Sequence, residues 1–325
     1  MNSEPALLFA LETTQDLGGQ VAAQLGQPLG RHEEREFGGG EQKVRPLEEV
    51  AGRDVYVVDS LYGDERLSAN DKLIRLLFFI GALKDAGAGR VTAVTPLIAY
   101  SRKDRRTKPR DPVSSRYVAA LFEAIGTDCI VTLEVHNVSA FENSFRTCRT
   151  EHVPVAGLIA SHLAARLPSA ELAVVSPDAG GVKRAELLRH VLEQKLARPV
   201  GKALMDKHRS MGLVSGSIFA GDVDGKTAII FDDLIGSGTT VLRAAAASRA
   251  SGASRVIAVA AHAMFQADAP LLGPDGPDEL IVTDTVPIPA AIADRVTIIG
   301  AAPILADVIG RLHKHEPVSD IIPYD

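Results

Sequence analysis

Cysteine and tryptophan are scarce in this sequence. Its 325 residues include two cysteines, Cys129 and Cys148, and no tryptophan. Neither cysteine lies in a CxxC pair or in another spacing typical of metal ligands. The sequence therefore predicts no cysteine-based metal or redox motif and favours a reduced cytoplasmic compartment.

Long apolar runs and an excess of positive charge are also missing. No stretch approaches the roughly 20 apolar residues that a transmembrane helix requires. The N-terminal segment 1–16 has no basic region, and its apolar run is too short for a signal peptide. The formal net charge of −6 argues against extensive nucleic-acid binding, although it is compatible with a local basic patch. We expect a soluble cytoplasmic protein without a membrane or nucleic-acid partner.

Short apolar runs rich in β-branched residues are frequent instead. They are apolar on successive positions, which is typical of strands covered on both faces. The runs are 55–59, 91–96, 130–135, 172–176, 227–231, 256–261, 280–284 and 297–300. Helix-length segments, such as 70–87 and 240–252, separate many of them. This alternation predicts an α/β fold with parallel sheets flanked by helices.

Parts of the sequence occur twice in similar form. VAGRDVYVVDS at 50–60 resembles VDGKTAIIFDD at 223–233, AGRVTAV at 88–94 resembles ASRVIAV at 253–259, and IVTLE at 130–134 resembles IVTDT at 281–285. Apolar strands can be alike by chance, but the shared order makes chance a weaker explanation. We predict two duplicated α/β domains, 1–155 and 156–302, with a C-terminal helix at 303–325 that joins the first domain.

The stretch FDDLIGSGTT, residues 231–240, combines two carboxylates with a loop of small and hydroxyl residues. We expect the strand to end at Phe231 and a helix to run from Val241. The loop would then lie at a helix N-terminus, where unpaired N–H groups and the helix dipole favour an anion. Asp232 and Asp233 would accept hydrogen bonds from ribose hydroxyls or hold a divalent metal.

These two halves together predict a sugar-phosphate ligand, with its phosphate on Ser237, Gly238, Thr239 and Thr240. The alternative is an ordinary strand–turn–helix junction in which Thr239 or Thr240 is the N-cap. The first copy of the repeat has a longer segment here, 60–71, without such a loop. Only the second domain is therefore expected to bind the sugar phosphate.

The run RKDRRTKPR at 102–110 contains six basic residues and one acidic residue. It has three interpretations: a solvated loop, a nucleic-acid patch, or a loop that binds a polyphosphate. The acidic whole and the lack of nearby aromatic residues beyond Tyr100 disfavour the nucleic-acid patch.

His136 follows a predicted strand, and Asp178 lies in SPDAGG, whose glycines allow close approach of a ligand to the backbone. His136 is a candidate metal ligand, and Asp178 is a candidate for the same ion or for a ribose hydroxyl. A purely structural histidine is the alternative.

FDDLIGSGTT resembles the phosphoribosyl-diphosphate binding motif of type I phosphoribosyltransferases. Further stretches are similar to ribose-phosphate pyrophosphokinases in particular, and they follow the family's order along nearly the whole chain. These are YSRKDRRTKPRDPVSSRYVA at 100–119, TLEVH at 132–136, VSPDAGGVKR at 175–184, MDKHR at 205–209, VTDTVPIP at 282–289 and LADVIGRLHKHEPVSDII at 305–322. The resemblance implies two duplicated phosphoribosyltransferase-like domains, each with a mainly parallel sheet flanked by helices.

The resemblance also implies an activity: transfer of diphosphate from Mg-ATP to the 1-hydroxyl of ribose 5-phosphate, which gives phosphoribosyl diphosphate and AMP for nucleotide biosynthesis. Mg²⁺ is the implied cofactor, with His136 and Asp178 as its ligands. Lys207 and Arg209 match a catalytic pair that the family carries on a mobile loop, here the glycine-bounded stretch 201–216.

Other matched positions imply contacts with ATP, namely Phe37, Glu41, Arg102, Lys103 and Asp104. Phe37 and Glu41 match residues that reach the nucleotide site of a neighbouring subunit, which implies a homo-oligomer. Three positions depart from the family pattern: Gly39 and Gly236 replace acids, and Lys103 replaces a glutamine. A phosphoribosyltransferase and a non-catalytic regulatory relative of the synthetase are the alternative functions.

Overall fold

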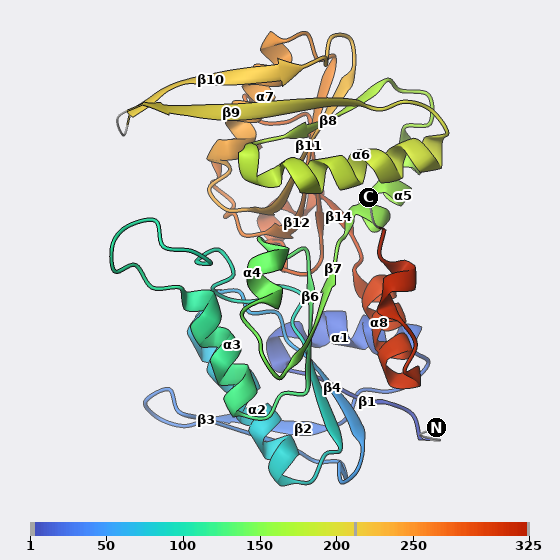
Figure 1. Ribbon diagram of the computed structural model, residues 1–325. Helices are drawn as coiled ribbons and strands as arrows, with labels where there is room; N and C mark the ends of the chain where they lie inside the picture. The colour runs from blue at the N-terminus through green and yellow to red at the C-terminus, as the bar shows by residue number, and fades with distance from the viewer. Residues whose placement is uncertain (1–3, 211–212, 324–325) are drawn as a thin grey trace. The chain divides into compact units, whose positions relative to one another are not determined.

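The computed structural model describes residues 4–210 and 213–323, and within residues 206–218 it describes the backbone course of the strands but no side chains. The chain forms two compact units (Figure 1). Unit 1 consists of Met1–Val153 and Ala301–Asp320, and unit 2 of Pro154–Gly300 and Ile321–Asp325.

Unit 1 is built on a five-stranded parallel sheet in the order β1-β4-β5-β6-β7. The strands are β1 (Leu7–Ala10), β4 (Asp54–Val58), β5 (Arg90–Val94), β6 (Cys129–Leu133) and β7 (Arg149–Val153). The helices are α1 (Gln15–Gln24), α2 (Ala69–Asp85), α3 (Ser114–Ala124), α4 (Val138–Glu142) and α8 (Ala302–Lys314), with 3-10 turns η1 (Glu12–Thr14) and η5 (Val318–Ile321). Every residue of β4 and β6 is buried, as expected for strands between two helical layers.

A separate antiparallel hairpin, β2 (His32–Glu36) and β3 (Gln42–Pro46), lies beside α2 (Figure 1). Helix α2 begins with a capping box, in which Ser68 Oγ accepts a hydrogen bond from Asp71 N and Asp71 Oδ2 accepts one from Ser68 N. The capping box fixes where α2 starts. Its first two turns therefore hold Lys72 and Arg75 at defined positions beside the hairpin.

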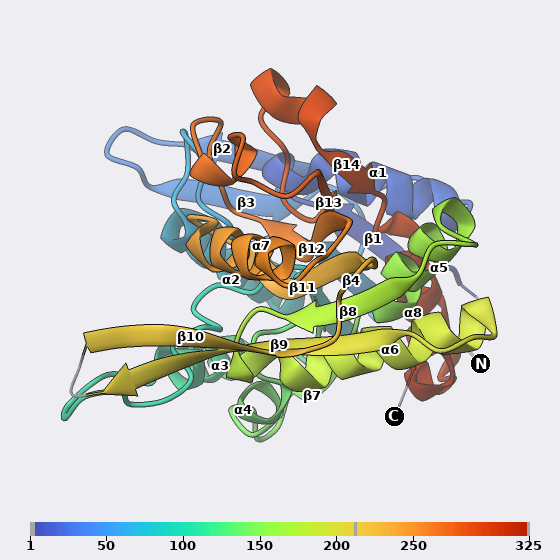
Figure 2. The same cartoon turned by 90° about the horizontal axis from the view of Figure 1, so that it is seen from above.

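Unit 2 contains a seven-stranded sheet in the order β10-β9-β8-β11-β12-β13-β14, in which only the β9–β10 pair is antiparallel. The strands are β8 (Leu172–Ser176), β9 (Gly201–Ser210), β10 (Leu213–Gly221), β11 (Thr227–Ile235), β12 (Arg255–Ala263), β13 (Glu279–Thr283) and β14 (Thr297–Ile299). The helices are α5 (Ala156–Arg166), α6 (Val182–Leu196) and α7 (Thr239–Ala250), with 3-10 turns η2 (Ala179–Gly181), η3 (Pro270–Leu272) and η4 (Ala290–Arg295). The β9–β10 hairpin extends beyond the other strands of this unit (Figure 2).

The predicted duplication is confirmed by the sheets. The repeated stretches form β4-β5-β6 in unit 1 and β11-β12-β13 in unit 2, as parallel neighbours in the same order. Asp54 pairs with Arg90, and Thr227 pairs with Arg255. Because these residues also correspond in the aligned repeats, the first two strands of both copies share one register. All eight predicted strands are present, and the predicted fold class is correct.

Four local predictions were wrong. Strand β11 continues past Phe231 to Ile235, because Leu234 and Ile235 still pair with β12, and α7 starts at Thr239 rather than Val241. The predicted helix 303–325 ends at Lys314, because His315 adopts a left-handed φ of 59° and a proline follows two residues later. The predicted loop 201–216 is largely a hairpin, because β9 pairs with β8 and β10.

None of the helices that the structure describes has the length and apolar character needed to span a membrane.

Candidate functional site

Asp232 and Asp233 lie near the end of β11, at the carboxyl edge of the parallel strands of unit 2. Asp233 is buried and Asp232 is partly buried. The backbone N–H of Asp233 donates to Oδ1 of Asp232 at 3.0 Å. Ligands of open α/β sheets bind at this edge. The acid pair is therefore in a position to contact one.

Arg184, in the first turn of α6, contacts both acids. Its Nη1 lies 3.6 Å from Oδ1 of Asp232 and 3.5 Å from Oδ1 of Asp233. Burial raises the pKa of Asp232, and the charge of Asp233 raises it further, whereas Arg184 opposes both effects. A carboxylate accepts hydrogen bonds, and a carboxyl that keeps its proton also donates one, so this end of the site suits hydroxyl groups or, once the proton is lost, a cation.

The loop after β11 is shaped by a glycine that no other residue can replace without strain. Gly238 is the N-cap of α7, has a φ of 76°, and would place a Cβ 2.3 Å from Cδ2 of Leu271. Ser237 and Thr239 on either side are exposed, and their hydroxyl oxygens are 3.1 Å apart. No side-chain hydrogen bond caps α7 among the described residues, so neither Thr239 nor Thr240 is its N-cap. An uncapped helix N-terminus with exposed hydroxyls beside it is an arrangement that binds anions in other proteins, and anion binding by this loop stays a prediction.

Asp178 follows β8, the neighbour of β11, and caps the turn η2. Its Oδ1 accepts hydrogen bonds from Gly180 N at 3.0 Å and Gly181 N at 3.2 Å. Ser176 Oγ donates to the Asp178 carbonyl at 2.7 Å. These contacts fix the carboxylate at the same carboxyl edge of the sheet as the acid pair.

In unit 1, the basic loop after Tyr100 is organised by an acid that the sequence analysis did not identify. Asp111 Oδ2 accepts hydrogen bonds from Lys103 Nζ and Thr107 Oγ1, both at 2.7 Å, and from two backbone N–H groups. The Lys103 and Thr107 contacts hold the pKa of Asp111 well below its usual range. Lys103 is therefore paired inside the loop, whereas Arg102 is exposed.

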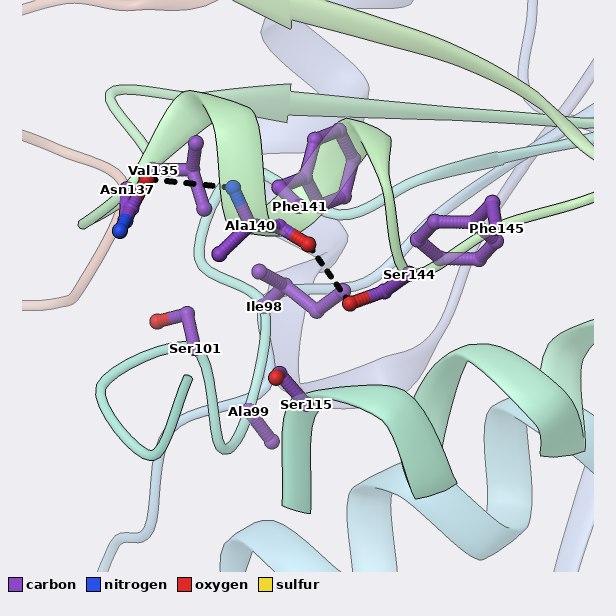
Figure 3. Close-up of a pocket in the computed structure, with 10 residues that line it drawn as sticks. All are labelled: Ile98, Ala99, Ser101, Ser115, Val135, Asn137, Ala140, Phe141, Ser144 and Phe145. Carbon is purple, nitrogen blue, oxygen red and sulfur yellow. Dashed lines mark hydrogen bonds between the residues drawn. The ribbon is translucent and has the colours of Figure 1, made fainter. Parts of the chain in front are cut away.

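A small pocket lies beside this loop (Figure 3). Ile98, Phe141 and Phe145 give it an apolar surface, and its remaining lining residues are Ala99, Ser101, Ser115, Val135, Asn137, Ala140 and Ser144. Asn137 Nδ2 donates to Asp104 Oδ2 at 2.7 Å, which ties the pocket to the loop. Ser115 Oγ is buried and has no hydrogen-bond partner among the described residues. The pocket therefore offers an apolar surface and a hydroxyl next to three predicted ATP contacts.

Phe37 and Glu41 flank the tip of the β2–β3 hairpin. Phe37 is 39% exposed, and Glu41 is also exposed. Phe37 N donates to the Glu41 carbonyl at 2.7 Å, and the Arg35 guanidinium lies 5.0 Å from the centre of the Phe37 ring. Both side chains are thus presented away from the core of unit 1.

The remaining predicted residues belong to different units or have side chains outside the described part of the structure. His136 is exposed after β6 in unit 1, whereas Asp178 belongs to unit 2. Lys207 and Arg209 lie on β9, but their side chains fall outside the described part of the structure. No group of three or more His, Cys, Asp or Glu side chains suited to a metal occurs among the described residues.

The sequence analysis missed Arg184 and Asp111. Arg184 lies inside the quoted SPDAGGVKR stretch, one helical turn after the glycines. A residue in the first turn of a helix that starts at the sheet edge remains close to that edge, so its position was a usable signal. Asp111 had a weaker signal, since a single acid that ends a basic run is often a hydrogen-bond acceptor for the loop itself.

The structure thus defines an α/β protein of two duplicated units, one of which carries an acid pair followed by a loop of glycine, serine and threonine at its sheet edge. A family model described as the N-terminal domain of ribose phosphate pyrophosphokinase matches residues 6–126, and the phosphoribosyl synthetase-associated domain matches residues 212–322.

Ribose-phosphate pyrophosphokinase 1 of Streptococcus pneumoniae serotype 4 is 33% identical over 97% of this chain and 96% of its own length. A crystal structure of phosphoribosylpyrophosphate synthetase from Mycobacterium smegmatis is 32% identical, with a TM-score of 0.85 over 96% of this chain and 100% of that chain. The chain belongs to the ribose-phosphate pyrophosphokinase family, and it is therefore an enzyme of the diphosphate-transferring class.

Proposed function

We propose that this protein transfers the diphosphate of ATP to the 1-hydroxyl of ribose 5-phosphate, forming phosphoribosyl diphosphate and AMP. The observation that carries the proposal is the combination of the acid pair Asp232–Asp233 with the uncapped loop before α7 on one sheet edge. A ligand that satisfies both has hydroxyl groups at one end and a phosphate at the other. Ribose 5-phosphate has this distribution.

In this proposal, Asp232 and Asp233 accept hydrogen bonds from the ribose hydroxyls, and residues 237–240 bind the 5-phosphate. Ser237 and Thr239 donate through their exposed hydroxyls, and the first N–H groups of α7 add backbone donors. Arg184 lowers the pKa of the acid pair against the effect of burial, and so favours the ionised form that accepts such bonds.

The nucleotide is assigned to unit 1 through Arg102, Lys103 and Asp104, with the apolar pocket next to them. The oxygen of the 1-hydroxyl attacks the β-phosphorus, the bond to the α–β bridging oxygen breaks, and AMP leaves with that oxygen while the hydroxyl proton passes to solvent. Little covalent work is left to the protein, so catalysis rests on positioning and on cations near the transferring phosphates. Lys207 and Arg209 are assigned this role.

Mg²⁺ fits the donors that are present. Carboxylate oxygens are its preferred protein ligands, and one or two of them with phosphate and water oxygens complete its coordination. Asp178 supplies a carboxylate fixed by two backbone N–H groups, and His136 is the second assigned ligand. When bound, the ion neutralises phosphate charge and orients the diphosphate of ATP.

A homo-oligomer is part of the proposal. Four large apolar side chains are exposed in pairs one turn apart, Ile74 and Phe78 on α2 and Tyr117 and Leu121 on α3. Such surfaces are typical of contacts between subunits. A second copy of the chain would cover them and would bring Phe37 and Glu41 to its nucleotide site.

Phosphorus NMR of the purified protein with Mg²⁺, ATP and ribose 5-phosphate tests the proposal. We expect AMP and a ribose-linked diphosphate to appear in equal amounts. Binding of ribose 5-phosphate by calorimetry without formation of AMP would instead favour a phosphoribosyltransferase or a regulatory relative. Absence of both binding and turnover would contradict the assignment of the site itself.

A further inference from the structure

Glu34, in the middle of β2, is the centre of a hydrogen-bonded cluster inside unit 1. Its Oε2 accepts a hydrogen bond from Arg75 Nη1 of α2 at 2.6 Å. Its Oε1 accepts one from the backbone N of Glu12 at 2.6 Å and lies 2.7 Å from His32 Nε2. One carboxylate thus joins three separate segments: the hairpin, the turn η1 and helix α2.

The Glu34–Arg75 pair is shielded from solvent. The Glu34 side chain is 12% exposed and that of Arg75 only 4%. Removing Glu34 would leave Arg75 with the half-exposed Glu12, 4.0 Å away, as its ion-pair partner among the described residues, and weakening a buried pair in this way is more disruptive than losing a surface pair. This contact therefore constrains the hairpin more strongly than its single hydrogen bond suggests.

The neighbouring position on the same strand provides a contrast. Glu33 points to the other face of β2 and pairs with Arg45 at 2.5 Å and Lys43 at 3.4 Å, both on β3. These side chains are more exposed than the Glu34–Arg75 pair, at 30% for Glu33, 41% for Lys43 and 55% for Arg45, and both partners belong to the hairpin itself. The Glu33 pairs can stabilise the hairpin internally, but they cannot fix it to the rest of unit 1.

The hairpin tip has few contacts of its own. Residues 38–40 are all glycine, and Gly39 and Gly40 have φ values of 94° and 85°. An added Cβ at any of the three would meet no atom within 4 Å. The placement of Phe37 and Glu41 on either side of this turn is therefore set by how the two strands below are anchored.

We propose that Glu34 and Arg75 are positioning residues, which hold the β2–β3 hairpin on α2 so that Phe37 and Glu41 are presented for nucleotide binding. This inference rests on the proposed function, because that function assigns the nucleotide contact to the hairpin tip. The pair does not touch substrate. Its effect is transmitted through β2, in which Glu34 lies two residues before the last strand residue, Glu36.

The test compares Glu34→Gln with Glu33→Gln, two isosteric changes at adjacent positions of one strand. Glu34→Gln keeps a carbonyl acceptor but removes the charge that faces Arg75. Hydrogen exchange of the hairpin amides reports anchoring without any need for activity. Steady-state kinetics then separate the KM for ATP from the KM for ribose 5-phosphate.

We expect Glu34→Gln to speed exchange across residues 32–46 and to raise the KM for ATP about tenfold, with the KM for ribose 5-phosphate unchanged. Glu33→Gln should alter none of these values. Arg75→Met should reproduce the effect of Glu34→Gln. Arg75→Lys should keep the hairpin exchange and the KM for ATP closer to their wild-type values, because the positive charge is retained. Circular dichroism melting identifies any variant that has lost its overall fold, and for such a variant the milder Arg75→Lys serves as the comparison.

The inference would be overturned by unchanged hairpin exchange in Glu34→Gln, or by faster exchange with an unchanged KM for ATP. Equal increases in both KM values would also overturn it, because they would indicate a general structural role. A wild-type protein that forms no AMP would contradict the proposed function instead. The exchange comparison would then still decide whether the pair anchors the hairpin.

Discussion

Arg184 Nη1 lies 3.6 Å from Oδ1 of Asp232, although the two residues come from different elements of unit 2, α6 and β11. The same nitrogen is 3.5 Å from Asp233. Two carboxylates next to each other on a partly buried strand repel, and a guanidinium shared between them lowers that repulsion. Arg184 thus lowers the repulsion within the acid pair from outside the loop that follows β11.

Replacing Arg184 with methionine should weaken binding of ribose 5-phosphate about tenfold at pH 7. The acid pair would then be less ionised, and a hydrogen bond from a ribose hydroxyl to a charged acceptor is worth roughly 1.5–3 kcal/mol. Loss of the guanidinium would raise the pKa of Asp232 further, so the acid pair would retain a proton more readily. Calorimetric titration with ribose 5-phosphate measures the change. Arg189→Met, on the same helix but paired with Glu186 and Glu193, is the control and should leave the affinity unchanged.

The glycines of the loop should differ sharply in their tolerance of a methyl group. Gly238→Ala should abolish ribose 5-phosphate binding, because its Cβ would overlap Leu271 and its backbone has a positive φ. Gly236→Ala should bind normally, since its Cβ would meet nothing closer than 4.0 Å, from Leu234. Calorimetry on both variants decides. Equal affinities would mean that the loop shape does not matter for binding.

The sheets of both units could be predicted because their central strands are continuous apolar runs. The hairpin β2–β3 and the edge strand β7 could not, because His32–Glu36 and Arg149–Val153 are mostly polar and only partly buried. Strands of this kind form through pairing and through contacts distant in sequence, which a local pattern does not contain.

The candidate site could likewise be predicted from the sequence only in part. Asp232, Asp233 and the loop at 236–240 are contiguous, so their chemistry is visible in ten residues of sequence. Their contact with Arg184 depends on the packing of α6 beside β11. The Glu34–Arg75 pair likewise joins residues 41 positions apart, and only the folded chain brings them together.

Lys207→Ala should reduce turnover by two or more orders of magnitude while leaving the affinity for ribose 5-phosphate unchanged. The reason is that a cation near the transferring phosphates stabilises charge that develops only in the transition state. Lys202→Ala, on the same strand β9 but within its parallel pairing with β8, is the control and should keep normal turnover. Normal turnover in Lys207→Ala would remove this residue from the catalytic assignment.

Asp59 occupies the position in unit 1 that Asp232 occupies in unit 2, but it is completely buried. Thr14 Oγ1 donates to its Oδ1 at 2.9 Å, whereas its Oδ2 has no hydrogen-bond partner among the described residues. Burial raises its pKa to about 7, although the positive charges of Arg75 and Lys72 and the Thr14 hydrogen bond act in the opposite direction. The nearby carboxylate of Glu34 adds to the increase.

A raised pKa in the folded state means that folding favours the protonated acid. The stabilisation from Asp59 should be complete below the unfolded pKa, near 4, and should disappear as the pH rises through about 7. Between pH 5 and pH 8 this loss amounts to about 3 kcal/mol. Asp59→Asn keeps the Thr14 contact but cannot titrate. We therefore expect urea unfolding to show that the unfolding free energy of the variant, relative to that of wild type, is about 3 kcal/mol higher at pH 8 than at pH 5.

Asp71→Asn, at the exposed capping box of α2, is the control for this pH effect. Its side-chain and backbone hydrogen bonds with Ser68 lower the pKa of Asp71, so its stabilisation is lost only as the pH falls below the usual range of an aspartate. Its difference from wild type should therefore stay constant between pH 5 and pH 8. If the difference between Asp59→Asn and wild type is equally constant, Asp59 is ionised throughout this range, and one of the cations beside it must neutralise it directly.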